Sequence, residues 1–363
     1  MIIGIDGNEA NVEKPVGVSV YTKNLLYWFS QWANNNTQFK VYLKQRPLKS
    51  LPKENKYYQY ITINGKFLWS QLFLPLELYL KNKVDLFFSP AHYSPRFCPV
   101  PQVVTIHDLS YFYYPNEFLK KDLYQLMNWT KYSVNKATKI IAVSKTTKKD
   151  LMKWYHLPED RIEVIYNGFE KNVNRRTAAV LGKENHYILF VGTLQPRKNL
   201  HVLIDAFNRL IKIRPEFSLV IAGKTGWLYE DIFQKVKNLG IEKKVIFTGH
   251  VPDEELTWLY KNAFCLVMHS FYEGFGIPIL EAMANGCPVI SSFTSSLPEV
   301  GGDACLYFDP QNPADLLDKL NQLINNDNLR KELIEKGRER IKLFSWKKSA
   351  EQTLKVIKDV CQA

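Results

Sequence analysis

Short runs of β-branched and aromatic residues alternate with segments of helical spacing along the whole chain of 363 residues, which restricts the folds open to it. Residues 18–33, 116–136 and 145–156 have helical spacing, and Ser144 is placed to cap the last of these helices. The expected strands are IIGI, FKVYLK, VDLFFS, QVVTIH, KIIAVS and IEVIYN in the first half, and YILFVG, FSLVIAG, KVIFTG, FCLVMHS, CPVISS and ACLYFD in the second. This alternation predicts an α/β protein with two Rossmann-like, doubly wound parallel sheets.

A polar, irregular segment, FEKNVNRRTAAVLGKEN (169–185), separates the two series of strands and predicts a linker. We therefore expect one domain over residues 1–170 and a second over residues 171–345, each long enough to bury its own core. Doubly wound sheets bind ligands beyond the carboxyl ends of their strands. We expect the two domains to face each other across a cleft, with the functional residues directly after the strands.

Composition narrows the class of protein. The first residues, MIIGIDGNEAN, lack a basic region followed by an apolar run, and no stretch reaches the roughly 18 uninterrupted apolar residues of a spanning helix. The five cysteines are scattered and form no CxxC pair, which argues against a disulfide framework or a zinc site. We therefore expect a cytoplasmic protein with reduced thiols.

The formal net charge of +12 is unevenly distributed, because residues 1–170 contain 22 basic and 14 acidic residues. A basic first half suits an anionic partner such as phosphates, a phospholipid surface or nucleic acid. A soluble surface that is simply rich in lysine explains the charge equally well.

Two glutamates, Glu273 and Glu281, flank a glycine-containing turn and the start of an apolar helix in SFYEGFGIPILEAMANGCPVISS (270–292). The N–H groups of that helix start form an anion site, and Gly274 and Gly276 let the backbone approach a ligand. Carboxylates accept hydrogen bonds from neighbouring hydroxyls, so the pair predicts a polyhydroxylated ligand such as a ribose or hexose. The alternative, that Glu281 only favours the helix dipole, explains one glutamate but not both.

Charged residues also follow two other predicted strands. Arg197 and Lys198, in GTLQPRKNL, are expected to open a helix, where the dipole disfavours cations, so they predict a bound diphosphate. Two solvated surface cations are an equally good explanation. His107 and Asp108, in VTIHDLS, predict acid–base chemistry or contacts to sugar hydroxyls. The alternative is a buried histidine bonded to the backbone, but the adjacent aspartate and the strand-end position favour function.

Several expected motifs are absent from the sequence. No GxGxxG occurs, and IAGKTG (221–226) has Ser218 where a phosphate-binding loop needs glycine. No two aspartates lie two positions apart, so the D-x-D pair that holds a divalent metal in many nucleotide-sugar enzymes is missing. We therefore predict no metal site; arginine, lysine and a helix N-terminus would bind the leaving group instead.

These motifs together resemble those of the family-four retaining glycosyltransferases, which have the GT-B fold. EGFGIPILEAMANGCPVISS is similar to the E-x7-E motif of that family, and GTLQPRKNL, FTGHVPDEEL, VSKTTKKDL and FSWKKSAEQTL lie in the expected order. The resemblance covers nearly the whole chain and is greatest to the bacterial mannosyltransferase-like branch, which builds surface polysaccharides.

The resemblance implies roles for residues of the second domain. Glu273 would contact the donor sugar together with the backbone N–H groups that follow it, and Glu281 would hold the ribose. Arg197 and Lys198 would neutralise the diphosphate. The N–H groups are those of Phe275, Gly276 and Ile277, and the base would be framed by His250 and Val251.

For the first domain, the resemblance implies that His107 touches the donor sugar near the reacting carbon and that Gly17 approaches the phosphate. The final segment, residues 346–363, would cross back to this domain as a helix. The chain departs from the family pattern in its first loop, where Val16–Gly17 replaces paired glycines, and at Thr193, where arginine is common. These departures concern how the phosphate is contacted.

The implied activity is retaining transfer of a hexose, with mannose favoured, from a nucleotide-diphosphate sugar to a glycan or lipid-linked acceptor, without metal or cofactor. GDP-mannose is the first expectation for the donor, and UDP-glucose or another UDP-sugar is the second. The enzyme alternatives are a sugar-nucleotide hydrolase or epimerase on the same scaffold. The non-enzyme alternative is a basic nucleic-acid-binding protein, against which the lack of aromatic–basic RNA motifs counts.

A last feature, GKFLWSQLFLPLELYLKNK (65–83), combines large apolar residues with lysines at its ends. We favour a helix packed into the core of the first domain, because every GT-B domain needs such helices; the basic first half also leaves open a peripheral contact with an anionic bilayer at the inner face of the plasma membrane.

Overall fold

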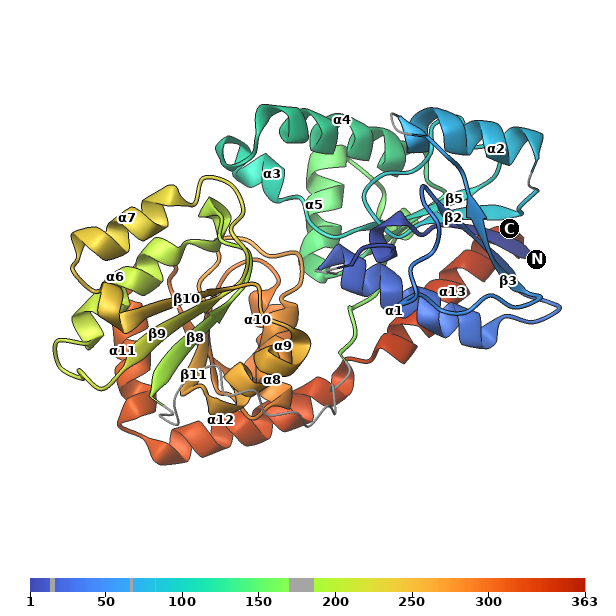
Figure 1. The fold of residues 1–363 in the computed structure, drawn as a ribbon. Coiled ribbons are helices and arrows are strands. Elements are labelled where there is room, and N and C mark those ends of the chain that lie inside the picture. The colour runs from blue at the N-terminus through green and yellow to red at the C-terminus, as the bar shows by residue number, and fades with distance from the viewer. Residues whose placement is uncertain (14–16, 66–67, 82, 170–185, 363) are drawn as a thin grey trace. The chain divides into compact units, whose positions relative to one another are not determined.

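The computed structural model describes residues 1–13, 17–65, 68–81, 83–169 and 186–362, and the chain divides into two compact units (Figure 1). The first unit comprises Met1–Gly168 and Phe344–Ala363, and the second comprises Phe169–Leu343. Beyond Phe169, the predicted linker and the predicted boundary after residue 170 lie outside the described residues.

A parallel sheet forms the centre of the first unit, with strand order β3-β2-β1-β4-β5-β6-β7. Its strands are β1 (Ile2–Asp6), β2 (Gln38–Leu43), β3 (Tyr58–Thr62), β4 (Leu86–Ser89), β5 (Gln102–Ile106), β6 (Lys139–Ala142) and β7 (Ile162–Val164). The inner strands read as continuous apolar runs because helices cover both faces of a parallel sheet. The sequence analysis missed β3, an edge strand whose residues YQYIT are mostly partly or fully exposed.

The helices of the first unit cover both faces of this sheet. They are α1 (Val18–Trp32), α2 (Leu74–Leu80), α3 (Ser110–Tyr113), α4 (Lys120–Lys136), α5 (Lys145–Tyr155) and α13 (Trp346–Gln362). The predicted cap of α5 is confirmed, because Ser144 accepts a hydrogen bond from the N–H of Thr147 at 3.0 Å. The C-terminal helix α13 packs against α1, β4 and β6 of this unit.

Strand register shows which helices share a face. Ser89 pairs with Val104, so Phe87 and Val104 point to the same side of the sheet. Phe87 packs in one core cluster with α2, and Val104 packs in another with α4 and α5. Thus α2, α4 and α5 cover one face, while α1 and α13 lie on the other, as Figure 1 shows.

The second unit contains a parallel sheet with strand order β10-β9-β8-β11-β12-β13, and every strand predicted for it is confirmed. The strands are β8 (Tyr187–Val191), β9 (Ser218–Ala222), β10 (Val245–Gly249), β11 (Cys265–Met268), β12 (Val289–Ser292) and β13 (Cys305–Phe308). The helices are α6 (Leu200–Leu210), α7 (Glu230–Asn238), α8 (Asp253–Asn262), α9 (Ile277–Ala284), α10 (Leu297–Gly301), α11 (Pro313–Ile324) and α12 (Asp327–Arg340).

The predicted fold class, two Rossmann-like units with parallel sheets, is confirmed. In the second sheet the chain runs outward from β8 to β10 and then returns to place β11 on the other side of β8. The loops after β8 and β11 therefore leave in opposite directions, which is where doubly wound sheets bind ligands. Within the described ranges, no helix is long and apolar enough to cross a bilayer.

Candidate functional site

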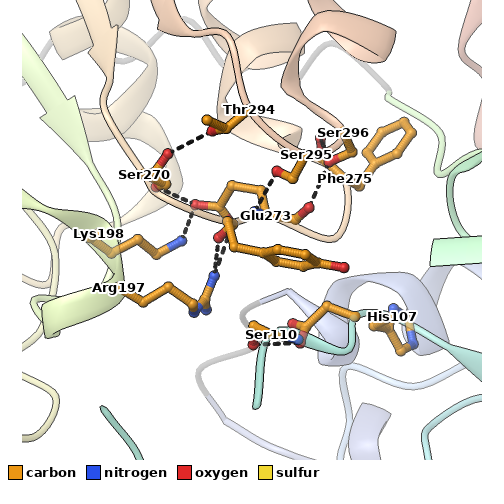
Figure 2. A network of polar contacts seen from close by, with 12 residues as sticks. His107, Ser110, Arg197, Lys198, Ser270, Glu273, Phe275, Thr294, Ser295 and Ser296 are labelled. Atoms are coloured by element: carbon orange, nitrogen blue, oxygen red, sulfur yellow. Dashed lines mark hydrogen bonds and ion pairs between the residues drawn. The ribbon is translucent and has the colours of Figure 1, made fainter. Parts of the chain in front are cut away.

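The loops after β8 and β11 bring Arg197, Lys198 and Glu273 into one network (Figure 2). Lys198 Nζ lies 2.5 Å from Glu273 Oε1, and Arg197 Nη1 lies 3.4 Å from Glu273 Oε2. Ser270 also donates to Glu273 Oε1 at 2.6 Å. Two cations and one carboxylate, predicted separately from two motifs, therefore form a single charged cluster.

Backbone contacts fix these two loops to each other. The N–H of Phe271 donates to the carbonyl of Arg197 at 3.1 Å, and Arg197 Nη1 donates to the carbonyl of Tyr272 at 2.6 Å. The ring of the fully buried His269 donates from Nδ1 to the carbonyl of Lys198. The charged side chains therefore extend from a rigid base, which holds them in place before any ligand binds.

The prediction that Arg197 and Lys198 open a helix is wrong in detail. Both lie in a single 3₁₀ turn, Pro196–Lys198, and α6 begins two residues later at Leu200. Asn199 separates the turn from the helix with a left-handed φ of 56°, and its side chain donates to two buried carbonyls. The cations thus stand before the helix and point to Glu273 instead of along the helix axis.

The electrostatic surroundings hold Glu273 in its charged form. Burial acts to raise the pKa of its carboxyl, but the Lys198 ammonium and the Arg197 guanidinium, with the hydrogen bonds from Lys198 and Ser270, outweigh burial. The pKa of Glu273 therefore lies below its ordinary value. The side chain of Glu273 is only 11% exposed, so its charge is felt across a little-hydrated site.

A segment rich in hydroxyls, SSFTSS (291–296), includes the last two residues of β12 and the loop after it, and holds the Glu273 loop from its other side (Figure 2). Ser295 accepts the N–H of Glu273 at 2.8 Å, and Ser296 donates to the carbonyls of Glu273 and Phe275 at 2.8 and 2.9 Å. Ser292 and Thr294 both donate to the carbonyl of Ser270. The sequence analysis missed these residues, for which the run of small hydroxyl side chains was the only signal.

The helix start beyond Glu273 requires glycine at one position. Gly276 caps α9 with a φ of 112°, and a Cβ at this position would lie 2.8 Å from Leu297 Cδ2. Gly274, Phe275 and Gly276 are buried, and Ile277 is partly buried. Helix α9 therefore begins four residues after Glu273, and the anion site expected at its start stays a prediction.

The second glutamate has different surroundings. Glu281 lies on α9, where Tyr260 of α8 donates to its Oε2 at 2.8 Å. Burial raises the pKa of Glu281; the Tyr260 hydrogen bond opposes this effect, and the charge of Asp253 adds to it. Neither Arg197 nor Lys198 is bonded to this carboxyl in the described structure. His250 and Val251 follow β10 just before α8, with His250 exposed and Val251 buried.

In the first unit, His107 follows β5 and is buried. Its Nε2 lies 2.8 Å from the carbonyl of Pro90, so Nε2 carries the proton. Burial and the nearby His92 lower the pKa of His107 to about 4, which keeps the ring neutral at pH 7. A neutral ring exchanges hydrogen bonds with a hydroxyl but has no proton to release as a general acid. The geometry therefore favours hydroxyl contacts over acid catalysis.

Asp108 follows His107 after β5, and Gly17 lies directly before α1. Asp108 accepts hydrogen bonds from the N–H and the hydroxyl of Ser110 at 3.0 and 2.7 Å, which fixes the start of α3. Gly17 caps α1 with a φ of 48°, and a Cβ there would meet no atom within 4 Å. Glycine is thus needed at residue 17 for its backbone conformation and not because a side chain would lack space. Val16, the other half of the predicted pair, lies outside the described residues.

No group of three or more His, Cys, Asp or Glu residues that could hold a metal ion is found within the described ranges.

Two family descriptions match the chain, Glycosyltransferase Family 4 over residues 18–172 and Glycosyl transferases group 1 over residues 174–340. O-antigen chain mannosyltransferase B of Escherichia coli is 35% identical over 266 residues, which cover 70% of this chain and 70% of that protein. O-antigen chain mannosyltransferase RfbU of Salmonella typhimurium is 34% identical over 58% of this chain and 57% of its own length.

Among solved structures, sucrose-phosphate synthase from Thermosynechococcus elongatus superposes with a TM-score of 0.78 at 18% identity. The superposition covers 99% of this chain and 98% of that one. At this identity the likeness concerns the fold.

Proposed function

This chain belongs to the mannosyltransferase-like branch of glycosyltransferase family 4 and has the GT-B fold, and from this membership we propose that it transfers a hexosyl group from a nucleotide-diphosphate sugar to a glycan or lipid-linked acceptor in the cytoplasm. The predicted family and fold are thereby confirmed. The donor, the stereochemistry and the independence from metal are parts of the proposal.

The observation that carries this proposal is the cluster of Lys198, Arg197 and Glu273 after β8 and β11. Two cations suit the diphosphate of a donor, and an ionised carboxylate suits the hydroxyls of its sugar. In a nucleotide-diphosphate sugar these two chemical groups are adjacent. A ligand that is both anionic and polyhydroxylated therefore matches the cluster better than a simple phosphate or a neutral sugar.

We assign the main catalytic effect to charge stabilisation on the leaving group. As the bond from the anomeric carbon to the diphosphate oxygen breaks, Arg197, Lys198 and the N–H groups at the start of α9 would stabilise the negative charge that develops on the leaving group. The acceptor oxygen bonds to the same carbon, and its proton passes to the departing phosphate oxygen. Attack on the side that the leaving group vacates gives retention. The stereochemistry of the product glycoside, read by NMR, tests this step, and an inverted product contradicts it.

The remaining assignments concern the rest of the donor. We propose that Glu281 holds the ribose and that the backbone at His250 and Val251 frames the base. In the first unit, we propose that Gly17 approaches the phosphate and that His107 contacts a sugar hydroxyl through its ring. This role for His107 agrees with its neutral state and leaves proton transfer to the phosphate.

GDP-mannose is the donor we favour, because the two O-antigen relatives described above are mannosyltransferases. The test is a thermal-shift comparison of GDP, UDP and ADP, since a ligand that binds the native state raises the melting temperature. We expect the largest shift with GDP, followed by mannosyl transfer in a donor screen. A shift with UDP alone makes the protein a UDP-sugar transferase. Release of free sugar or interconversion of the donor without an acceptor assigns a hydrolase or epimerase instead.

Independence from metal is tested with the same assay. We expect transfer to persist in excess EDTA, because arginine, lysine and backbone N–H groups supply the positive charge. Activity that disappears with EDTA and returns with magnesium or manganese contradicts this part of the proposal and leaves the family assignment intact.

A further inference from the structure

Within the described part of the chain, one hydrogen bond holds the imidazole of His107. Nε2 lies 2.8 Å from the carbonyl of Pro90, and the ring is buried directly after β5. One hydrogen bond fixes one atom of a ring but not its plane, because the χ2 torsion of histidine has only a broad, two-fold preference. Nδ1 is the nitrogen that remains for a sugar hydroxyl, so the packing around the ring decides where its lone pair points.

Tyr21 of α1 packs against this imidazole. The two ring centroids are 4.8 Å apart and the ring planes meet at 84°, which is an edge-to-face arrangement. His92 is a second aromatic neighbour of His107, with ring centroids 5.8 Å apart and planes at 44°. An edge-to-face pair is directional, because the positive edge of one ring meets the negative face of the other. Tyr21 therefore restrains the ring plane that the hydrogen bond to Pro90 leaves free.

The hydroxyl of Tyr21 is fixed to the strand that leads to His107. It lies 3.0 Å from Thr105 Oγ1, and the Tyr21 ring is completely buried. Thr105 and His107 are two residues apart at the end of β5, so the alternation of a strand places them on the same face of the sheet. Burial raises the pKa of Tyr21 to about 12, so the hydroxyl keeps its proton at pH 7. A single side chain thus joins α1 to β5 and contacts the imidazole two residues farther along.

The first residue of α13 also packs on Tyr21. Trp346 is buried, and its ring centroid lies 6.1 Å from that of Tyr21, with the planes at 64°. Helices α1 and α13 contact each other on this face of the sheet (Figure 1). Tyr21 therefore has β5, His107 and α13 as neighbours, and close packing of this kind leaves a large ring few alternative positions.

We propose that Tyr21 is a positioning residue, which sets the plane of the His107 imidazole and so directs Nδ1 to a hydroxyl of the bound sugar. This role rests on the proposed function, which gives His107 the contact with that hydroxyl. Because Tyr21 is completely buried, it acts through His107 and not through a contact of its own with the substrate. The simpler explanation, that Tyr21 only fills the core of the first unit, predicts a loss of stability and no effect specific to His107.

A double-mutant cycle separates the two explanations. The variants are Tyr21→Leu, His107→Ala and the two together, and the measurement is kcat at saturating donor. The contact of an edge-to-face pair is worth roughly two- to tenfold, and we expect Tyr21→Leu to lower kcat by about that factor. In the His107→Ala background, the same substitution is expected to lower kcat no further, because the ring that Tyr21 orients is gone. Equal factors in the two backgrounds would overturn the proposal.

Two further variants control for loss of packing. Tyr21→Phe keeps the ring beside His107 and removes only the bond to Thr105, so it is expected to restore most of the kcat lost in Tyr21→Leu. The matched control is Tyr58→Leu, since Tyr58 is an equally buried tyrosine of the same sheet on β3, four strands from β5. We expect it to lower the melting temperature as Tyr21→Leu does and to leave kcat unchanged. An equal loss of kcat in both leucine variants would assign Tyr21 to general packing.

The ¹⁵N resonances of the His107 imidazole test the positioning without the reaction. In the wild type we expect one neutral form with the proton on Nε2, as the bond to Pro90 requires. Tyr21→Leu is expected to weaken that bond and to add the form with the proton on Nδ1, whereas Tyr21→Phe and Tyr58→Leu keep the single form. A single Nε2-protonated form in Tyr21→Leu would overturn the proposal, even if kcat falls.

The same two measurements distinguish this proposal from the proposed function. If Tyr21→Leu adds the second imidazole form but His107→Ala transfers sugar as fast as the wild type, Tyr21 does set the ring. In that case the substrate contact assigned to His107 is what fails.

Discussion

Glu273 and Glu281 lie eight residues apart, at the two ends of one turn and helix start, yet they have opposite electrostatic surroundings. Glu273 is bonded to two cations and a hydroxyl, and its pKa is lowered. Glu281 is bonded to one tyrosine hydroxyl, and burial raises its pKa. Two carboxylates of the same motif thus differ: Glu273 is held in its ionised form by its partners, whereas burial disfavours the ionised form of Glu281.

This difference matches the two parts of the proposed donor. Glu281 accepts a side-chain hydrogen bond from Tyr260, and the neighbouring hydroxyls of a ribose would supply further donors, so binding is expected to lower its pKa. Glu273 already has its partners, and a sugar hydroxyl has to share or replace one of them. Under the proposed function, we therefore expect the contacts of Glu273 to change while the bond to the diphosphate breaks and those of Glu281 to stay the same through the reaction.

The largest expected effect is that of Glu273→Ala on kcat. Loss of a charged hydrogen bond to a buried hydroxyl costs on the order of 2–3 kcal/mol, which is roughly a hundredfold in rate. Glu273→Gln keeps the shape but not the charge and is expected to lie between the wild type and Glu273→Ala. The measurement is steady-state kinetics with varied donor. An undiminished kcat in Glu273→Ala would show that this carboxylate does not act on the reacting sugar.

The counterpart is Glu281→Ala, which removes a contact made equally in the ground and transition states. It is expected to raise the donor KM roughly tenfold and to leave kcat nearly unchanged. If both alanine variants change kcat and KM in the same proportion, the division of the two glutamates between sugar and ribose is wrong.

A smaller effect is expected from Ser296→Ala, which tests how the Glu273 loop is held. The fully buried hydroxyl of Ser296 shares its one proton between the carbonyls of Glu273 and Phe275, and loss of this hydrogen bond is expected to cost about 0.5–1.5 kcal/mol in the free energy of unfolding. Ser291→Ala is the matched control, since Ser291 is equally buried but donates only to the carbonyl of its neighbour Ser292.

The serine variants are compared by chemical denaturation and by donor kinetics. We expect Ser296→Ala to lower stability more than Ser291→Ala and to raise the donor KM several-fold, since the Glu273 loop loses its support. Equal effects of the two variants on KM would assign Ser296 to general packing.

The sequence predicted the strands and the candidate residues at their ends better than it predicted the contacts between those residues. Twelve of the thirteen strands found in the described part of the chain follow from apolar runs, and β3 was missed because its residues are those of an exposed edge. Strand-end positions identified Glu273, Arg197 and Lys198 as candidates. Their mutual pairing spans 75 residues or more in sequence and depends on β8 lying beside β11, which no local pattern encodes.

The same limit applies to the supporting residues. Tyr260 and Ser296 act on the two glutamates from elements 21 and 23 residues away, and neither belongs to a motif with a mechanism of its own. Hydroxyls of this kind are common in any sequence, so only the folded geometry distinguishes those that hold the site.

The pH dependence of stability is expected to have opposite signs at the two glutamates. The lowered pKa of Glu273 means that its stabilisation is complete above its ordinary pKa of 4.5 and is lost as the pH falls through the folded-state value. The raised pKa of Glu281 means that its ionised carboxylate destabilises the folded state at pH values above the folded-state pKa. This destabilisation disappears as the pH falls through that pKa.

Glutamine substitutions measure this difference. Glu273→Gln is expected to lower the free energy of unfolding at pH 7 and Glu281→Gln to raise it. Each variant's difference from the wild type in the free energy of unfolding shrinks as the pH falls. The Glu281→Gln difference shrinks as the pH falls to about 4.5, and the Glu273→Gln difference shrinks below that pH. Denaturation series from pH 7 to acid pH test this, and changes of the same sign at pH 7 contradict the comparison.

The smallest expected effect is that of Tyr260→Phe, which removes the one hydroxyl bonded to Glu281 and leaves the ring in place. A hydrogen bond of this kind is worth about 0.5–1.5 kcal/mol, so the donor KM is expected to rise a few-fold with kcat unchanged. Since that bond lowers the pKa of Glu281, its loss raises the pKa further, and the pH at which KM begins to increase on acidification moves upward.

Tyr187→Phe is the matched control, because this buried hydroxyl donates to the carbonyl of Leu259, next to Tyr260, and not to a carboxylate. It is expected to lower stability without moving the pH profile of KM. If both variants move that profile equally, Tyr260 supports α8 and does not tune Glu281.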